Sequence, residues 1–197
     1  MPQNIDIKLV LSIAASVVTV IAYYPYIKDI FLRKTKPHIY TWLIWFITTG
    51  TATAGLWLGG GGNGIISISV VLLLVLFIVI LSVKYGTKDI TKGDTVILIL
   101  ALSSIIVWWQ LDNPVLAVIM VAAIDGLGYI PTYRKSWNSP CEETFSFWVA
   151  MVAIYTLMLL SIAEYNLLTV PYVATALICN IILINILFFR RRLVTQL

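Results

Sequence analysis

The chain has 197 residues, of which 60% are hydrophobic and only 11% are charged, and its net charge is +4 at pH 7. A soluble domain carries about 25% charged residues, so this chain has too few to cover a surface that faces water, and the composition predicts an integral membrane protein. The single histidine, His38, excludes a histidine metal cluster, and two cysteines, Cys141 and Cys179, make no disulfide framework.

Seven apolar stretches follow one another along the chain, and each is about long enough to cross a bilayer as a helix. A spanning helix needs about 20 mostly apolar residues. The expected spans are residues 7–30, 39–59, 64–84, 95–111, 114–134, 145–163 and 167–189. The segment GGGGNG between the second and third spans is interpreted as a turn, because no Lys-Ser/Thr of a phosphate-binding loop follows it. The predicted fold class is therefore an all-α membrane protein with seven transmembrane helices.

The basic residues gather at every second connection between these spans. Twelve of the thirteen lysines and arginines lie at or just after the ends of the first, third, fifth and seventh spans, and only Lys8 lies on the other side. Cytoplasmic loops carry an excess of Lys and Arg, so this pattern predicts a cell-membrane protein with its N-terminus outside and its C-terminus in the cytoplasm. The positive charges are then topology signals, and no nucleic-acid partner is expected.

A short motif, Tyr-x-Pro with a basic residue three positions after the proline, occurs in both the first and the fifth span. The matching pairs, each 106 residues apart, are Tyr23 and Tyr129, Pro25 and Pro131, Lys28 and Arg134, and Trp42 and Trp148. A unit of three helices crosses the membrane an odd number of times, so a second copy directly after it would be inverted. One extra helix between the two copies gives both the same orientation. The sequence predicts two parallel triple-helix bundles, residues 1–84 and 114–197, joined by a linker over residues 85–113 that holds the fourth helix.

The repeated prolines lie near the cytoplasmic ends of their helices. A proline inside a helix removes one backbone hydrogen bond and clashes with the carbonyl four residues earlier, which kinks the helix. Two kinks at matched positions give the protein a pair of hinges beside a central pathway. We interpret Pro25 and Pro131, with Tyr23 and Tyr129 beside them, as hinge or gate residues.

Two segments carry a family resemblance. YYPYIKDIFLRKTKP, residues 23–37, and GYIPTYRKSWNSPCEETFSFW, residues 128–148, resemble the PQ-loop motifs of the SWEET, SemiSWEET and PQ-loop transporters, although Tyr26 and Thr132 stand where the motif glutamine usually follows the proline. The resemblance implies an alternating-access carrier for a sugar or other small polar metabolite, facilitative or proton-coupled, with a central site between the two bundles. It also implies that Trp57, in the outer half of the second span, stacks on the solute.

A few polar and aromatic residues inside the spans are candidates for that site. Asp125 is the only acid in the middle of a span, and Asn180 lies at a similar depth in the seventh. A carboxylate there carries a proton, binds a cationic or hydroxyl-rich solute, or serves packing between helices. Thr19 is the residue that the predicted repeat aligns with Asp125. Tyr155 in the sixth span is a further candidate for lining the site.

The remaining tryptophans are expected in the aromatic belts at the membrane surfaces. Trp42, Trp45 and Trp148 lie at cytoplasmic ends of spans, and Trp108 and Trp109 lie at an outer end.

Other classes of function stay open at this stage. Alternatives on the same topology are a vitamin-uptake carrier of the PnuC type, a non-transporting receptor and a cation channel. The sequence shows no nucleophile with a base, no metal-ligand cluster and no cofactor fingerprint, so neither an enzyme nor a cofactor is expected. The expected partners are a small polar solute, protons and lipid. One monomer suffices for a pathway, and a homo-oligomer is compatible with it.

Overall fold

A computed structural model describes residues 6–87, 90–111 and 113–195, and these residues form seven α-helices and one short 3-10 helix, without a β-strand. The helices are α1 (Ile7–Phe31), α2 (Ile39–Leu58), α3 (Gly64–Tyr85), α4 (Lys92–Leu111), α5 (Pro114–Asn138), η1 (Pro140–Glu142), α6 (Phe145–Ser161) and α7 (Val170–Thr195). The all-α fold class is confirmed. Lys88 and Asp112 of the predicted linker, and the side chains of Trp108 and Trp109, lie outside the described part of the chain.

Each predicted span corresponds to one α-helix, with bounds that differ by a few residues. Among the described residues, four helices are long and apolar enough to cross a membrane, namely α1, α3, α5 and residues Val170–Leu193 of α7, while α6 is apolar but shorter. These helices are compatible with an integral membrane protein. The 20-residue α2 carries five threonines, and four of them, Thr41, Thr48, Thr49 and Thr51, are buried inside the protein.

Local sequence explains where several helices begin. The Asp6 carboxylate accepts hydrogen bonds from the backbone N–H groups of Lys8 and Leu9, and the Asn113 side chain accepts one from Leu116 at 3.0 Å. Both residues satisfy N–H groups that a helix start leaves without an internal partner. In the turn between α2 and α3, Gly60 and Gly62 have φ angles of +73° and +56°, which only glycine adopts readily. The predicted glycine turn is confirmed.

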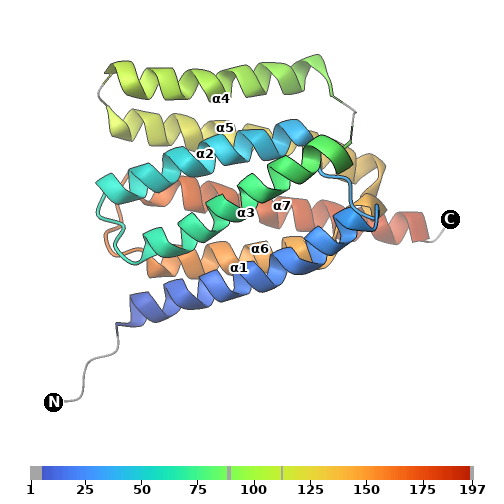
Figure 1. Cartoon of the computed structure of the whole chain (residues 1–197), viewed down its shortest axis with the longest axis horizontal. Coiled ribbons are helices and arrows are strands. Elements are labelled where there is room, and N and C mark those ends of the chain that lie inside the picture. The colour runs from blue at the N-terminus through green and yellow to red at the C-terminus, as the bar shows by residue number, and fades with distance from the viewer. Residues whose placement is uncertain (1–5, 88–89, 112, 196–197) are drawn as a thin grey trace.

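The helices lie side by side along the long axis of the molecule (Figure 1). The helix α3 packs against both α1 and α2, and α7 packs against both α5 and α6. Across the molecule, α1 packs against α6 while α2 packs against α5, and α4 covers α5 and α2. Exchanging the first three helices for the last three leaves the contacts of α3 with α1 and α2, of α7 with α5 and α6, of α1 with α6 and of α2 with α5 unchanged, whereas α4, among the described residues, packs against α5 and α2 but not against α1 and α6.

The predicted cytoplasmic end is closed by a buried ion pair. The Lys135 ammonium lies 2.7 Å from the Glu143 carboxylate, and the two side chains are only 9% and 2% exposed. Lys135 also donates to the backbone carbonyl of Lys36 at 2.6 Å, and the Trp148 indole N–H donates to Glu143 at 3.0 Å. The segment after α1 is therefore tied to the segment after α5.

A second buried carboxylate ties α4 to the same end of the molecule. Asp94, in the first turn of α4, accepts a hydrogen bond from Arg134 of α5 at 3.1 Å. Its carboxylate also lies 3.5 Å from the ring of His38, which directly precedes α2. Asp94 thus joins α4 to both halves of the chain.

Gly55 of α2 lies tightly against Val118 of α5, and this contact gives a first prediction. A Cβ atom at Gly55 would lie 2.6 Å from the Val118 side chain, so we expect Gly55→Ala to lower the free energy of unfolding by about 1–3 kcal/mol through overpacking. The measurement is denaturant unfolding in detergent micelles. Adding Val118→Ala should restore most of the loss.

A matched control lies on the same helix. A Cβ atom at Gly50 would meet its nearest neighbour, the Leu72 side chain, at an ordinary 3.8 Å. Gly50→Ala should therefore be neutral or slightly stabilising, because alanine favours the helix. Equal destabilisation by both substitutions would show that the contact with Val118 is not the cause.

Candidate functional site

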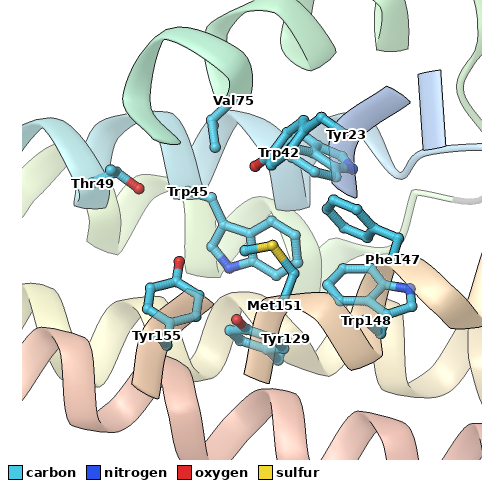
Figure 2. Close-up of a pocket in the computed structure, with 10 residues that line it drawn as sticks. All are labelled: Tyr23, Trp42, Trp45, Thr49, Val75, Tyr129, Phe147, Trp148, Met151 and Tyr155. Carbon is cyan, nitrogen blue, oxygen red and sulfur yellow. The ribbon is translucent and has the colours of Figure 1, made fainter. Parts of the chain in front are cut away.

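An enclosed cavity lies between α1, α2, α3, α5 and α6, and most of its wall is aromatic (Figure 2). Its lining residues are Tyr23, Trp42, Trp45, Thr49, Val75, Tyr129, Phe147, Trp148, Met151 and Tyr155. The volume of the cavity that the centre of a water-sized sphere can occupy is about 10 Å³. That volume corresponds to about one water molecule, so in this conformation the cavity is closed around a very small space.

Most of the lining residues form pairs with the 106-residue spacing of the predicted repeat. Four pairs separated by 106 residues line the cavity, namely Tyr23 and Tyr129, Trp42 and Trp148, Trp45 and Met151, and Thr49 and Tyr155. Only Val75 and Phe147 stand outside these pairs. Sequence comparison found the first two pairs because the residue types are identical, and it missed the other two because they differ. Equivalent positions of the two halves thus meet at one place.

The aromatic rings close the cavity by packing on one another. The ring centroids of Trp45 and Tyr129 are 4.6 Å apart, and those of Tyr23 and Phe147 are 5.0 Å apart with nearly perpendicular planes. Tyr26 of α1 packs on Phe147 at 4.3 Å. These separations are typical of attractive tilted and edge-to-face ring pairs. The Tyr23 and Tyr129 side chains therefore lie in the wall of the cavity.

The belt prediction for three of the tryptophans is wrong. Trp42, Trp45 and Trp148 are only 2%, 6% and 2% exposed, whereas a belt residue faces lipid and water. They lie on the faces of α2 and α6 that turn towards the other helices. Their position near a helix end set their depth correctly but did not reveal this direction.

Asp125 lies on α5 in a polar layer next to the cavity, and it is 1% exposed. The Thr48 hydroxyl donates a hydrogen bond to its carboxylate at 2.6 Å. Tyr172 of α7 lies beside the same carboxylate and shares a 2.7 Å hydrogen bond with Thr49, a lining residue. No lysine, arginine or histidine in the described ranges forms an ion pair with Asp125.

Glycines allow other helices to approach α5 closely on either side of this acid. A Cβ atom at Gly128 would lie 3.0 Å from Ile44 of α2, and one at Gly126 would lie 3.4 Å from Thr175 of α7. Because glycine has no side chain, α2 and α7 lie close to α5 here, and hydroxyl groups of both helices reach Asp125. The contact with α7 is made by Tyr172, two turns before the expected partner Asn180.

Asn180 is fully buried on α7 and is tied to the cavity wall through Tyr129. Its amide N–H group donates to the Tyr129 hydroxyl at 2.7 Å and to the Ala176 carbonyl at 2.8 Å. Its carbonyl oxygen Oδ1 has no hydrogen-bond partner among the described residues, and neither has the indole N–H of Trp45. Of these two atoms, the Trp45 indole N–H belongs to a residue that lines the cavity, while Asn180 lies behind Tyr129.

The other predicted residues divide into two groups. Tyr155 lines the cavity, and both Pro25 and Pro131 stand inside their helices close to the lining tyrosines. Thr19 is buried, but its hydroxyl donates to the Ala15 carbonyl of its own helix at 2.7 Å, and the structure records no contact with Asp125. The asymmetric pairing of Thr19 with Asp125 in one site is therefore not what the fold forms.

Trp57 does not line this cavity. It is 73% exposed and lies with Gly50, Ala54 and Leu72 at a depression on the outer surface of α2 and α3. Trp57 follows Gly50 by two helical turns and so shares its outward face, while Thr48 and Thr49 occupy the inward face. The resemblance placed Trp57 at the right depth but on the wrong side of the helix.

Sequence reasoning missed Thr48, Thr49, Trp45 and Tyr172. The threonines had a usable signal, because polar residues at helical spacing in an apolar span mark the face that avoids lipid. Comparison of the chain with protein-family models, with curated proteins and with solved structures found no match in any of the three. The interpretation below therefore depends on the site itself, an aromatic cavity backed by one carboxylate.

Proposed function

We propose that this protein is an alternating-access carrier of the PQ-loop/SWEET type, which moves a sugar or other small polar metabolite across the cell membrane. Transport is facilitative or coupled to protons. The observation that supports this function best is the set of four pairs, each 106 residues apart, that line one enclosed cavity. A carrier built from two parallel repeats needs its central site to be formed by equivalent positions of both repeats.

The proposed architecture is two triple-helix bundles, α1 to α3 and α5 to α7, with α4 as the linker. The packing of α3 on α1 and α2, and of α7 on α5 and α6, supports this division. We place the N-terminus outside, because the connections that carry the basic residues meet at the end opposite to the start of α1 (Figure 1).

In this proposal the structure corresponds to a closed state of the transport cycle. The aromatic rings fill the pathway on its cytoplasmic side, and the hydrogen bond from Lys135 to the Lys36 carbonyl holds the two halves together below them. Opening towards the cytoplasm requires these contacts to separate. The prolines of α1 and α5 stand at the same level, where bending of the helices moves the rings apart.

A test of the hinges follows from this cycle. Pro131→Ala and Pro25→Ala each restore a backbone hydrogen bond, to the carbonyls of Leu127 and Ile21 respectively, and favour a straight helix. We expect solute exchange to become several-fold slower, with thermal stability in detergent unchanged or raised. The measurement is counterflow of labelled solute in proteoliposomes.

The matched control is Pro171→Ala, since Pro171 is the second residue of α7. Its missing N–H is one that a helix start leaves unpaired in any case, so this change should leave exchange unaffected. If both hinge variants exchange solute at the parental rate, the prolines of α1 and α5 have only a structural role.

The function as a whole is tested by flux measurements on purified protein in proteoliposomes. A panel of sugars, amines and amino acids is tested for uptake, with and without an imposed proton gradient. The proposal predicts uptake that saturates with solute concentration. Uptake that rises linearly with concentration supports a channel instead, and a folded protein without uptake of any solute overturns the carrier proposal.

A further inference from the structure

The charges inside the molecule indicate which kind of solute the cavity binds. Between the two ends of the helices, Asp125 is the only charged residue of the described spans. The basic residues lie at helix ends, where Lys135, for example, is paired with Glu143. A buried carboxylate without a basic partner is costly in an apolar interior unless something positive neutralises it.

The aromatic wall favours a positive guest over a negative one. Seven of the ten lining residues have aromatic rings, and no lining residue is a lysine, arginine or histidine. The faces of aromatic rings carry partial negative charge and attract cations, and cages of such rings bind quaternary ammonium groups. Tyr129 and Tyr155, which line the cavity, also lie within electrostatic range of Asp125.

One of the two unpaired polar atoms, the Asn180 acceptor, points to the same class, whereas the Trp45 indole N–H fits an acceptor atom of the solute such as a hydroxyl oxygen. The Asn180 Oδ1 atom is a buried acceptor without a donor, and Tyr129 joins this amide to the cavity wall. An ammonium or hydroxyl group of a solute supplies the missing donor. A carboxylate or phosphate solute would instead meet the Asp125 carboxylate and a wall of ring faces, with no cationic group among the described lining residues to bind it.

We propose that the solute is a small organic cation, whose charged group is held between the aromatic rings and Asp125. This inference rests on the proposed carrier function and names its substrate class. Since the closed cavity admits about one water molecule, the cation enters only after the rings separate. A proton and the cation neutralise the same carboxylate, so each competes with the other.

The test compares two probes of the same shape that differ in charge. One is choline, and the other is its neutral isostere, in which a tert-butyl group replaces the trimethylammonium group. Binding to the purified protein in detergent is followed by quenching of tryptophan fluorescence, independently of transport. Loss of a desolvated cation–π interaction corresponds to about 30-fold, so the neutral probe should bind about 30-fold more weakly or not at all.

Two tryptophan variants supply a matched pair. Trp45→Leu removes a ring from the cavity wall and should weaken choline binding about tenfold. Trp57→Leu makes the same change on the outer surface and should leave binding as in the parent. Asp125→Asn should also weaken choline binding while leaving the weak binding of the neutral probe unchanged.

The outcomes separate this inference from the carrier function. Equal binding of choline and its isostere, or binding of neither, overturns the cation assignment, and saturable uptake of glucose in the same preparation would show that the carrier function survives. Selective choline binding without choline uptake in proteoliposomes supports the site and contradicts the carrier. Unchanged choline affinity in a folded Trp45→Leu protein would place the cation elsewhere, and the comparison of the two probes needs no variant to fold.

Discussion

Replacing Lys135 with Met is expected to lower the free energy of unfolding by about 3–5 kcal/mol. The substitution leaves the Glu143 carboxylate, whose side chain is 2% exposed, without its cationic partner. It also removes the donor to the carbonyls of Lys36 and Glu142, which Lys135 reaches at 2.6 and 3.0 Å. The measurement is equilibrium unfolding of the purified protein in detergent, followed by near-ultraviolet circular dichroism.

Two further variants isolate the cause of this loss. Lys135→Met combined with Glu143→Gln removes the stranded charge but keeps an acceptor for the Trp148 indole, so it should recover more than half of the stability. Lys36→Met breaks an ion pair with Glu142 whose side chains are 44% and 37% exposed, and it should cost less than about 1 kcal/mol. A loss from Lys135→Met no larger than that from Lys36→Met would show that burial does not strengthen the pair.

Asp125→Asn is expected to make transport insensitive to a proton gradient. The amide keeps the size of the side chain and can still accept the 2.6 Å hydrogen bond from Thr48, but it does not titrate. In the parent, protonation of this carboxylate is the proposed way in which protons couple to the solute. The quantity measured is the ratio of initial uptake rates with and without a pH gradient across the proteoliposome membrane.

A matched control makes the same chemical change at another buried acid. Asp94, which is 1% exposed, is paired with Arg134 and lies beside His38 at the end of the molecule. Asp94→Asn should weaken the attachment of α4 while leaving the response to a pH gradient intact. If the Asp125→Asn protein keeps the parental ratio, proton coupling at Asp125 is wrong, and a role in solute binding or packing remains.

The errors at the tryptophans show where prediction from sequence reached its limit. Trp45 and Trp57 lie on one helix, and the depth of each was predicted from its distance to the helix end. Their directions were assigned wrongly: Trp45 lines the cavity, while Trp57 is 73% exposed. In a soluble helix a polar face marks the outside, whereas in α2 the buried threonines Thr48 and Thr49 mark the inside, and this reversed signal was not used for the tryptophans.

The predicted repeat also shows a limit of prediction from sequence, because only its identical pairs were recognised. The identical pairs, such as Tyr23 and Tyr129, were visible along the chain, and the structure adds Trp45 with Met151 and Thr49 with Tyr155 at the same spacing. In the predicted repeat, equivalent positions keep their place even when the residue types change, because place depends on the backbone. Only a view of the cavity reveals pairs whose chemistry has diverged.

The sequence by itself determined the seven helices, their approximate bounds and the clustering of basic residues at alternate connections. It did so because a bilayer requires long apolar helices, in which every backbone polar group is satisfied internally. The tertiary structure alone decided how each helix is rotated about its axis, and therefore that Thr48 and Tyr172 reach Asp125 while Thr19 does not. Rotation depends on close contacts such as that of Gly55 with Val118, which involve residues far apart in the chain and leave no periodic signal in an apolar sequence.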